Sequence, residues 1–174
     1  MENTTHLPGS PRRIVTVGFG NTLRSDEAVG IRIATTVADW NLPQVRALAV
    51  PQLTRDLADV LQDADLVVFV DACTDRATCP CGVQLTTLYP SRSPLPSSEF
   101  ACDPRSLLAT TQARFERVPQ AWWMTVPGTD FEVGDRLSPL AELGMARALS
   151  CLEVLLGVTS WPSKEGYARA AIRA

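Results

Sequence analysis

The sequence lacks several features that would assign it to a common class of protein. It has a single histidine, His6, and no apolar run of the roughly 20 residues that a membrane-spanning helix needs. It does not open with a basic segment followed by an apolar one, so we expect no secretory signal. Its formal net charge of −3 offers no electrostatic footprint for nucleic acid or an anionic membrane. We therefore expect a cytoplasmic protein that acts on a small molecule or another protein.

The cysteines do not form a recognisable framework either. There are five, an odd number, at scattered positions: Cys73, Cys79, Cys81, Cys102 and Cys151. Without a secretory context this argues against disulfides. Cys79 and Cys81 are spaced as C-x-C, and the only histidine lies far away in the N-terminal segment, so we predict no zinc site. Cys73 is expected to be a small buried side chain, with a soft metal ligand or a reactive thiol as the alternatives.

The composition of the chain fits one globular domain. With 174 residues, of which 45% are hydrophobic and 20% charged, it can bury a sizeable core. The first segment and the last are polar and carry no periodic apolar pattern. We predict a flexible N-terminal arm at 1–12, a single α/β domain at 13–158 and a polar C-terminal tail at 159–174.

Short apolar segments alternate with segments of helical period along this domain. The predicted strands are 13–18, 45–50, 65–71, 83–89 and 121–126, and the predicted helices are 27–40, 54–62, 104–116 and 139–158. Nearly continuous apolar strands are typical of parallel sheets covered on both faces. The fourth strand alternates between apolar and polar residues and is therefore expected at a sheet edge. The pattern predicts a three-layer α/β/α sandwich around a twisted, mostly parallel five-stranded sheet.

Local signals refine the last two helices and the fifth strand. Asp103 and Ser138 each precede a proline, which is a strong helix start. Trp122 and Trp123 are expected to pack on opposite faces of the sheet. The side chains of the last helix that we predict to face the core are those of Leu143, Ala146, Leu149, Leu152, Val154 and Leu155.

The segment "GFGNTLRSDEAVG" is a glycine-rich connection between the first strand and the first helix. Such turns often hold phosphates, but this one lacks the pattern in detail. Leu23 stands where a dinucleotide fingerprint has its third glycine, and the Gly-Lys-Ser or Gly-Lys-Thr end of a P-loop is absent. Asp26 and Glu27 would also repel phosphate at the helix start. We interpret the turn as one that faces a cation.

A second acidic residue is expected at the same edge of the sheet. Ligands of parallel α/β sheets bind at the carboxyl ends of the strands, where Glu27 and Asp71 both fall. If the first and third strands are neighbours, the two carboxylates meet and either share a proton or bind a divalent cation. Alternatively, Glu27 only complements the helix dipole and Asp71 is an ordinary turn residue. The loop residues predicted to contact the ligand are Gly18, Gly20, Asn21 and Asp26.

Four blocks of sequence resemble a known family. In order and spacing, "IVTVGFGNTLRSDEAVGIRIA", "LVVFVDA", "DPRSLLATT" and "GTDFEVGDRLSP" are similar to the hydrogenase maturation endopeptidases, over residues 13–157. The resemblance implies a cytoplasmic, single-domain α/β/α protein. It also implies an endopeptidase that removes a short C-terminal extension from the large-subunit precursor of a nickel-iron hydrogenase once nickel has been inserted.

The resemblance also implies a metal-recognising site. Its acidic members map onto Glu27 and Asp71, which become the predicted catalytic residues and the predicted ligands of substrate-borne nickel or of another divalent metal. The family's histidine does not map, because Phe100 stands in its place and Pro51 occupies the position of another histidine that relatives often carry. Two carboxylates alone hold nickel weakly.

Three nearby residues are alternatives for the absent histidine: Cys73, Cys102 and Asp103. Two functions follow from this departure. The chain is either a processing endopeptidase, which the intact acidic pair favours, or a noncatalytic member of the family that binds a metalloprotein precursor as an assembly factor, which the missing histidine favours.

Overall fold

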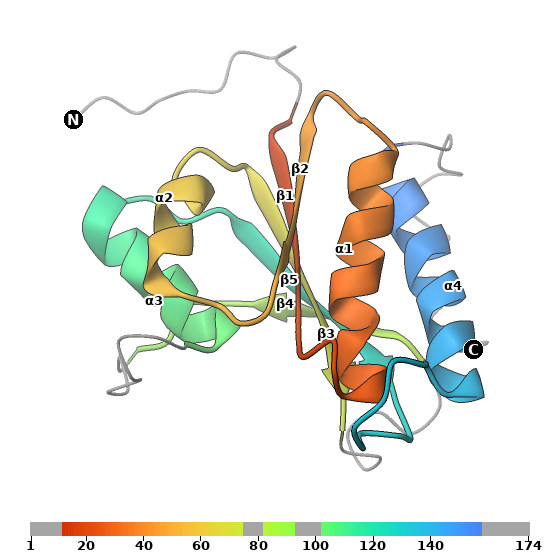
Figure 1. Ribbon diagram of the computed structural model, residues 1–174. Helices are drawn as coiled ribbons and strands as arrows, with labels where there is room; N and C mark the ends of the chain where they lie inside the picture. The colour runs from red at the N-terminus through yellow and green to blue at the C-terminus, as the bar shows by residue number, and fades with distance from the viewer. Residues whose placement is uncertain (1–11, 75–81, 93–101, 158–174) are drawn as a thin grey trace.

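A five-stranded sheet with the order β2-β1-β3-β5-β4 is the centre of the molecule (Figure 1). The computed structural model describes residues 12–74, 82–92 and 102–157. The strands are β1 (Ile14–Phe19), β2 (Val45–Val50), β3 (Leu66–Cys73), β4 (Gln84–Leu88) and β5 (Gln120–Pro127). All neighbours pair in parallel except β4, which lies antiparallel to β5 at the edge. The predicted mostly parallel sheet and its edge strand are confirmed.

Helices cover both faces of this sheet. They are α1 (Val29–Asp39), α2 (Ala58–Leu61), α3 (Pro104–Phe115) and α4 (Pro139–Leu155), with single 3₁₀ turns at η1 (Ser25–Ala28) and η2 (Arg55–Leu57). α1 and α4 pack on one face, and α2 and α3 on the other (Figure 1). The three-layer α/β/α sandwich is therefore confirmed. None of these helices is long and apolar enough to span a membrane.

Each face of the sheet has its own hydrophobic core. Ile33 and Leu152 belong to the core beneath α1 and α4, and Leu61 and Leu107 to the core beneath α2 and α3. Trp122 packs against the first of these cores and the adjacent Trp123 against the second. The alternation of side chains along β5 thus places the two indoles on opposite faces, as predicted.

The face that α4 presents to the core differs in part from the prediction. Leu143 is 51% exposed and Ala146 is exposed, so both were wrongly assigned to the core. The buried residues of this helix are Ala141, Gly144, Ala148 and Leu152. The reason is the closeness of α4 to β5, because a Cβ atom added to Gly144 would lie 2.6 Å from Val126 Cγ1. Small residues therefore make the closest contacts of α4, and Leu149, Leu152 and Leu155 pack against the same core, as predicted.

The two predicted helix starts are confirmed. Asp103 Oδ1 accepts hydrogen bonds from the backbone N–H groups of Arg105 and Ser106, at 2.8 and 3.1 Å. Ser138 Oγ accepts one from the N–H of Ala141, at 3.2 Å. These bonds satisfy donors that the first turn of a helix leaves without partners.

The predicted segment boundaries fall mostly outside the described residues. Only Arg12 of the arm at 1–12 is described, and the tail at 159–174 is not described at all. The flexible arm and the polar tail therefore stay predictions, and so do the boundaries of the single domain at 13–158.

Two glycines allow α1 to begin directly against the sheet. A Cβ atom on Gly18 of β1 would lie 1.9 Å from the carbonyl oxygen of Gly30 in α1. One on Gly30 would lie 2.5 Å from the carbonyl oxygens of Phe19 and Val70. Since backbone atoms cannot yield as a flexible side chain can, only glycine fits at either position. This contact sets the position of the turn that precedes α1.

We expect Gly18→Ala to destabilise the protein by about 3 kcal/mol, because the added methyl group must push α1 away from β1. Gly82→Ala is the matched control, since the nearest atom to its added Cβ is Arg147 Nη1 at 4.0 Å, and it should change stability by no more than about 0.5 kcal/mol. Urea unfolding measures both values. Equal stability of the two variants would contradict the close contact.

Candidate functional site

Glu27 and Asp71 lie at the carboxyl edge of the sheet, which is the lower edge in Figure 1. The two strands that lead to them, β1 and β3, are parallel neighbours. Glu27 belongs to η1, the single turn between β1 and α1, and η1 contacts β3. The arrangement on which the predicted carboxylate pair depended is therefore present.

The sequence pattern predicted that Asp71 ends its strand, and this prediction is wrong. β3 continues to Cys73, because β5 offers it backbone partners from Gln120 as far as Pro127. On its other side, the pairing of β3 with β1 ends at Val70. Asp71 is therefore paired with β5 on one side of β3. On the other side it lies one residue beyond the last pair with β1, and η1 contacts β3.

The two carboxylates interact electrostatically. Burial raises the pKa of Asp71 to about 7, against a hydrogen bond from the Ala72 N–H that lowers it, and the negative charge of Glu27 raises it further. The Ala72 nitrogen lies 2.7 Å from Asp71 Oδ1. Near neutral pH, Asp71 is thus divided between its acid and carboxylate forms. A carboxyl group with such a pKa readily releases its proton when a cation binds beside it.

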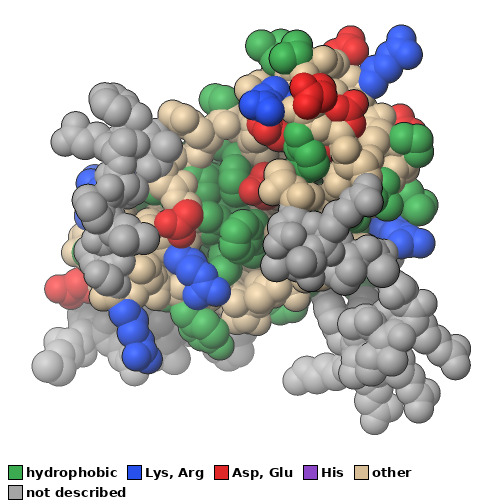
Figure 2. All heavy atoms as spheres, turned by 90° about the horizontal axis from the view of Figure 1, so that it is seen from below, with side chains coloured by type: hydrophobic (Ala, Val, Ile, Leu, Met, Phe, Trp, Pro, Cys, Tyr) green, Lys and Arg blue, Asp and Glu red, His purple; other side chains and the backbone are tan. Residues whose placement is uncertain are grey.

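Figure 2 looks onto this edge of the molecule from below. Hydrophobic side chains gather near the middle of the face, and acidic side chains lie beside them. Two of the exposed hydrophobic residues of the chain belong to loops at this edge: Leu23 is 70% exposed and Val133 is 89% exposed. The candidate site therefore combines negative charge with apolar surface.

Asp26, the neighbour of Glu27, is fully buried and has an internal role. Its Oδ2 atom accepts hydrogen bonds from the N–H groups of Thr129 and Asp130 and from the hydroxyl of Ser138, at 2.7, 2.9 and 2.7 Å. Its Oδ1 atom accepts one from the N–H of Ser138, at 2.6 Å. Asp26 thus positions the turn that carries Glu27, by tying it to a distant loop and to the start of α4.

The pKa of Asp26 reflects these bonds. Burial by itself raises the pKa, but hydrogen bonds from Asp130, Ser138 and Thr129 outweigh it and hold the pKa below its ordinary value. A lowered pKa in the folded state means that the ionised group stabilises the fold above the pKa of the unfolded chain. This stabilisation is lost as the pH falls through the pKa of the folded state.

We expect Asp26→Asn to destabilise the protein by on the order of 3 kcal/mol at pH 7, because it removes charge-assisted hydrogen bonds and places an NH₂ group among backbone donors. The difference from the native protein should shrink as the pH falls below 3.8 and through the lowered pKa of the folded state, because the native aspartate is then protonated too. Chemical unfolding at pH 7 and at a series of lower pH values tests this. A constant difference across the range would refute the role of the charge.

The other loop residues predicted to contact a ligand serve the shape of the turn. Gly20 has a φ of +143°, and a Cβ atom there would lie 1.9 Å from the carbonyl oxygen of Glu27. Asn21 is exposed, and its Oδ1 accepts a hydrogen bond from the N–H of Leu23 at 2.9 Å. Gly18 admits the start of α1. Ligand contact by Gly18, Gly20 and Asn21 stays a prediction.

Sequence reasoning missed Arg24. Its Nε atom lies 3.3 Å from Glu27 Oε1, and its Nε and Nη2 atoms donate to the carbonyl oxygen of Phe131 at 3.1 and 2.9 Å. The spacing of three residues between Arg24 and Glu27 was a usable signal for the ion pair. Nothing local predicted Phe131, which is 107 residues away.

A third metal ligand is not found in the parts of the chain that the structure describes. There, no three His, Cys, Asp or Glu side chains form a group able to hold a metal ion. Asp103 uses its carboxylate to cap α3. Burial and the charge of Asp103 raise the pKa of the Cys102 thiol, although Arg55 opposes them, so this thiol is a poor source of thiolate. Cys73 is half-buried at the end of β3.

Other residues considered as ligands fall outside the described ranges or on the surface. Phe100, which stands at the family's histidine position, is among the residues that are not described, as are His6, Cys79 and Cys81. Pro51 is exposed after the end of β2.

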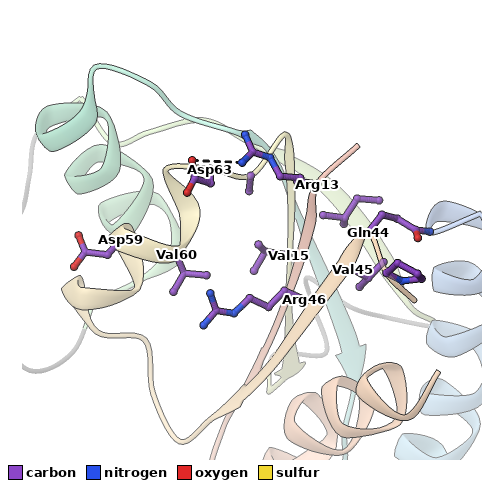
Figure 3. Close-up of a pocket in the computed structure, with 11 residues that line it drawn as sticks. Arg13, Val15, Gln44, Val45, Arg46, Asp59, Val60 and Asp63 are labelled. Carbon is purple, nitrogen blue, oxygen red and sulfur yellow. Dashed lines mark ion pairs between the residues drawn. The ribbon is translucent and has the colours of Figure 1, made fainter. Parts of the chain in front are cut away.

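A hollow of about 260 Å³ lies near the opposite end of β1 and β2 (Figure 3). Its lining includes Arg13, Val15, Arg46 and Val60, and an ion pair of 3.5 Å joins Arg13 to Asp63 at its rim. It contains neither carboxylate of the pair. Since parallel α/β sheets bind their ligands at the carboxyl ends of the strands, we place the candidate site at Glu27 and Asp71 instead.

The raised pKa of Asp71 makes a prediction about stability. Between its ordinary value of 3.8 and about 7, the folded state binds more protons than the unfolded chain, so the stability contributed by Asp71 falls as the pH rises through this range. Asp71→Asn should therefore be more stable than the native protein at pH 8, by about 4 kcal/mol, and nearly equal at pH 4. Asp39→Asn, at an exposed carboxylate, is the control. A pH-independent effect of Asp71→Asn in urea unfolding would count against the raised pKa.

Comparison with known proteins identifies the fold. No protein-family model and no curated protein sequence matches the chain. The nickel-iron hydrogenase maturation protease HycI from Thermococcus kodakarensis KOD1 matches its structure with a TM-score of 0.65 at 20% identity, over 86% of this chain and 95% of that one. The hydrogenase-maturating endopeptidase HybD from E. coli matches with a TM-score of 0.63 at 20% identity, over 83% and 92%. A hydrogenase 2 maturation peptidase from Thaumarchaeota archaeon SCGC_AB-539-E09 gives 0.63 at 19%, over 85% and 100%. The chain has the fold of the hydrogenase maturation proteases.

Proposed function

We propose that this protein is a hydrogenase maturation endopeptidase, which removes a C-terminal extension from the large-subunit precursor of a nickel-iron hydrogenase after nickel insertion. The observation that carries the proposal is the coupled pair of Glu27 and Asp71 at the carboxyl edge of this fold. The maturation proteases with similar structures support it, and so do the four sequence blocks that resemble the family.

The chemistry of the pair suits a metal that belongs to the substrate. Carboxylate oxygens bind hard and borderline divalent cations, and a cation beside Asp71 favours loss of its proton. Two carboxylate donors fill only part of the coordination shell of a metal ion. A precursor with inserted nickel brings the other ligands of the metal with it. Substrate-borne nickel can polarise a peptide carbonyl or a water molecule for hydrolysis. Glu27 and Asp71 then hold the metal-bearing region of the precursor against the carboxyl edge.

Exposed apolar side chains beside the pair favour a protein as the substrate. The loops that carry Leu23 and Val133 are joined by two backbone hydrogen bonds, from Ser25 N–H to the Gly134 carbonyl and from Gly134 N–H to the Leu23 carbonyl, each 3.0 Å. Apolar side chains that gather on one face of a protein are typical of interaction surfaces. We propose that these two loops contact the precursor.

A noncatalytic assembly factor is the second candidate. The observation in its favour is the absence of a third ligand among the described residues, together with Phe100 at the position of the family's histidine. Such a protein would hold the same nickel-loaded precursor through Glu27 and Asp71 and leave the peptide bond intact.

Incubation with a nickel-loaded large-subunit precursor, followed by intact-mass spectrometry, separates the two candidates. The endopeptidase should reduce the precursor by the mass of its C-terminal extension and should leave a nickel-free precursor unchanged. Glu27→Gln should slow cleavage by at least about 100-fold, because one of two oxygen donors to the metal is neutralised. Asp39→Asn, at an exposed acid at the far end of α1, should cleave normally.

The remaining outcomes decide against cleavage. If the precursor binds in pull-down experiments but keeps its full mass, the assembly factor is supported and the endopeptidase is excluded for that precursor. If Glu27→Gln cleaves as fast as the native protein, the acidic pair is not the active site.

A further inference from the structure

Arg24 gives the acidic pair a fixed counter-charge. Its Nε atom is 3.3 Å from Glu27 Oε1, and its Nε and Nη2 atoms both donate to the carbonyl oxygen of Phe131. The backbone of Arg24 is also fixed, since it forms an isolated parallel bridge with Gly134. Exposed ion pairs usually contribute little because both side chains must be ordered for them to form. Here the Phe131 carbonyl orders the arginine independently of Glu27.

The counter-charge changes which cations the site attracts. Two carboxylates with a guanidinium beside them carry less negative charge than two carboxylates alone, so they attract a bare divalent ion less strongly. A metal that already has anionic ligands behaves differently. Its ligands are attracted to the guanidinium, while its open coordination positions remain available to Glu27 and Asp71.

The third nitrogen of the Arg24 guanidinium, Nη1, is available to donate a hydrogen bond to such a ligand. The interactions of the guanidinium with Glu27 and Phe131 use Nε and Nη2. Among the described residues, Nη1 makes no hydrogen bond. The side chain is about half exposed, so an approaching anionic group can reach it.

We propose that Arg24 makes this site selective for a divalent metal already held by anionic ligands, as in a metal-loaded partner protein, over the free metal ion. This inference rests on the proposed function and adds a specificity-determining residue to it. Arg24 repels free divalent cations that would otherwise occupy the pair, and it offers a hydrogen bond to an anionic ligand of the metal that the partner carries.

Isothermal titration of the full chain with two probes tests the proposal. One probe is free Ni²⁺, and the other is Ni²⁺ bound to nitrilotriacetate, which carries net negative charge and leaves two coordination positions open. Arg24→Gln should bind free Ni²⁺ about fivefold more tightly and the anionic complex about fivefold more weakly than the native protein. Arg24→Lys keeps the charge and should retain the native order of affinities.

Arg32→Gln is the matched control, because Arg32 donates to the backbone carbonyl of Asp135 on the same loop, while Arg24 is the arginine paired with Glu27. It should change neither affinity. Thermal melts monitored by circular dichroism confirm that each variant is folded. If Arg24→Gln shifts both affinities in the same direction or leaves both unchanged, the proposed selectivity is wrong. Arg24→Lys behaving like Arg24→Gln would also contradict it, since charge would then not be the cause.

Asp71→Asn distinguishes this failure from a failure of the proposed function. If Asp71→Asn no longer binds either probe while Arg24→Gln binds both with native affinity, the acidic pair is the metal site and only the role of Arg24 is refuted. If Asp71→Asn binds both probes as the native protein does, the metal binds elsewhere, and the proposed site falls together with the selectivity.

Discussion

The buried carboxylate of Asp26 is the interaction on which the rest of the site depends. It joins the turn after β1, the loop at Thr129 and Asp130, and the first turn of α4 at Ser138. Burying a charge is unfavourable unless hydrogen bonds replace its hydration, and four donors do so here. Because Glu27 is the next residue, the same bonds set the place of the predicted metal ligand.

The glycines of the turn serve the same purpose as Asp26. Gly18 and Gly30 let the start of α1 approach the backbone of β1 and β3, and Gly20 lets the chain pass close to Glu27. The glycine-rich loop resembles a phosphate-binding turn because both need close backbone approach. In this protein the approach is between segments of the chain itself, and it leaves an acidic side chain at the edge where a phosphate loop would present N–H groups.

The electrostatic balance of the site follows from this packing. Asp71 lies just past the paired part of β1, where burial raises its pKa and the charge of Glu27 adds to the effect. Arg24 opposes the negative charge of Glu27 through their ion pair, in an orientation set by Phe131. The site is thus a partly neutralised pair of carboxylates, whose affinity for a cation depends on what else the cation carries.

The sequence by itself determined the strands and helices of this fold, the capping of α3 and α4 by Asp103 and Ser138, the edge position of β4 and the edge of the sheet at which Glu27 and Asp71 lie. These features depend on local periodicity and on neighbouring residues, which a sequence displays directly. Only the tertiary structure decided that Asp26 faces inward, that Arg24 is held by Phe131, that β3 continues past Asp71 and that small residues of α4 make its closest approach to β5. Each of these depends on close contact with distant residues, which for Asp26 are 103 to 112 positions away, and no local pattern records how closely two such segments approach.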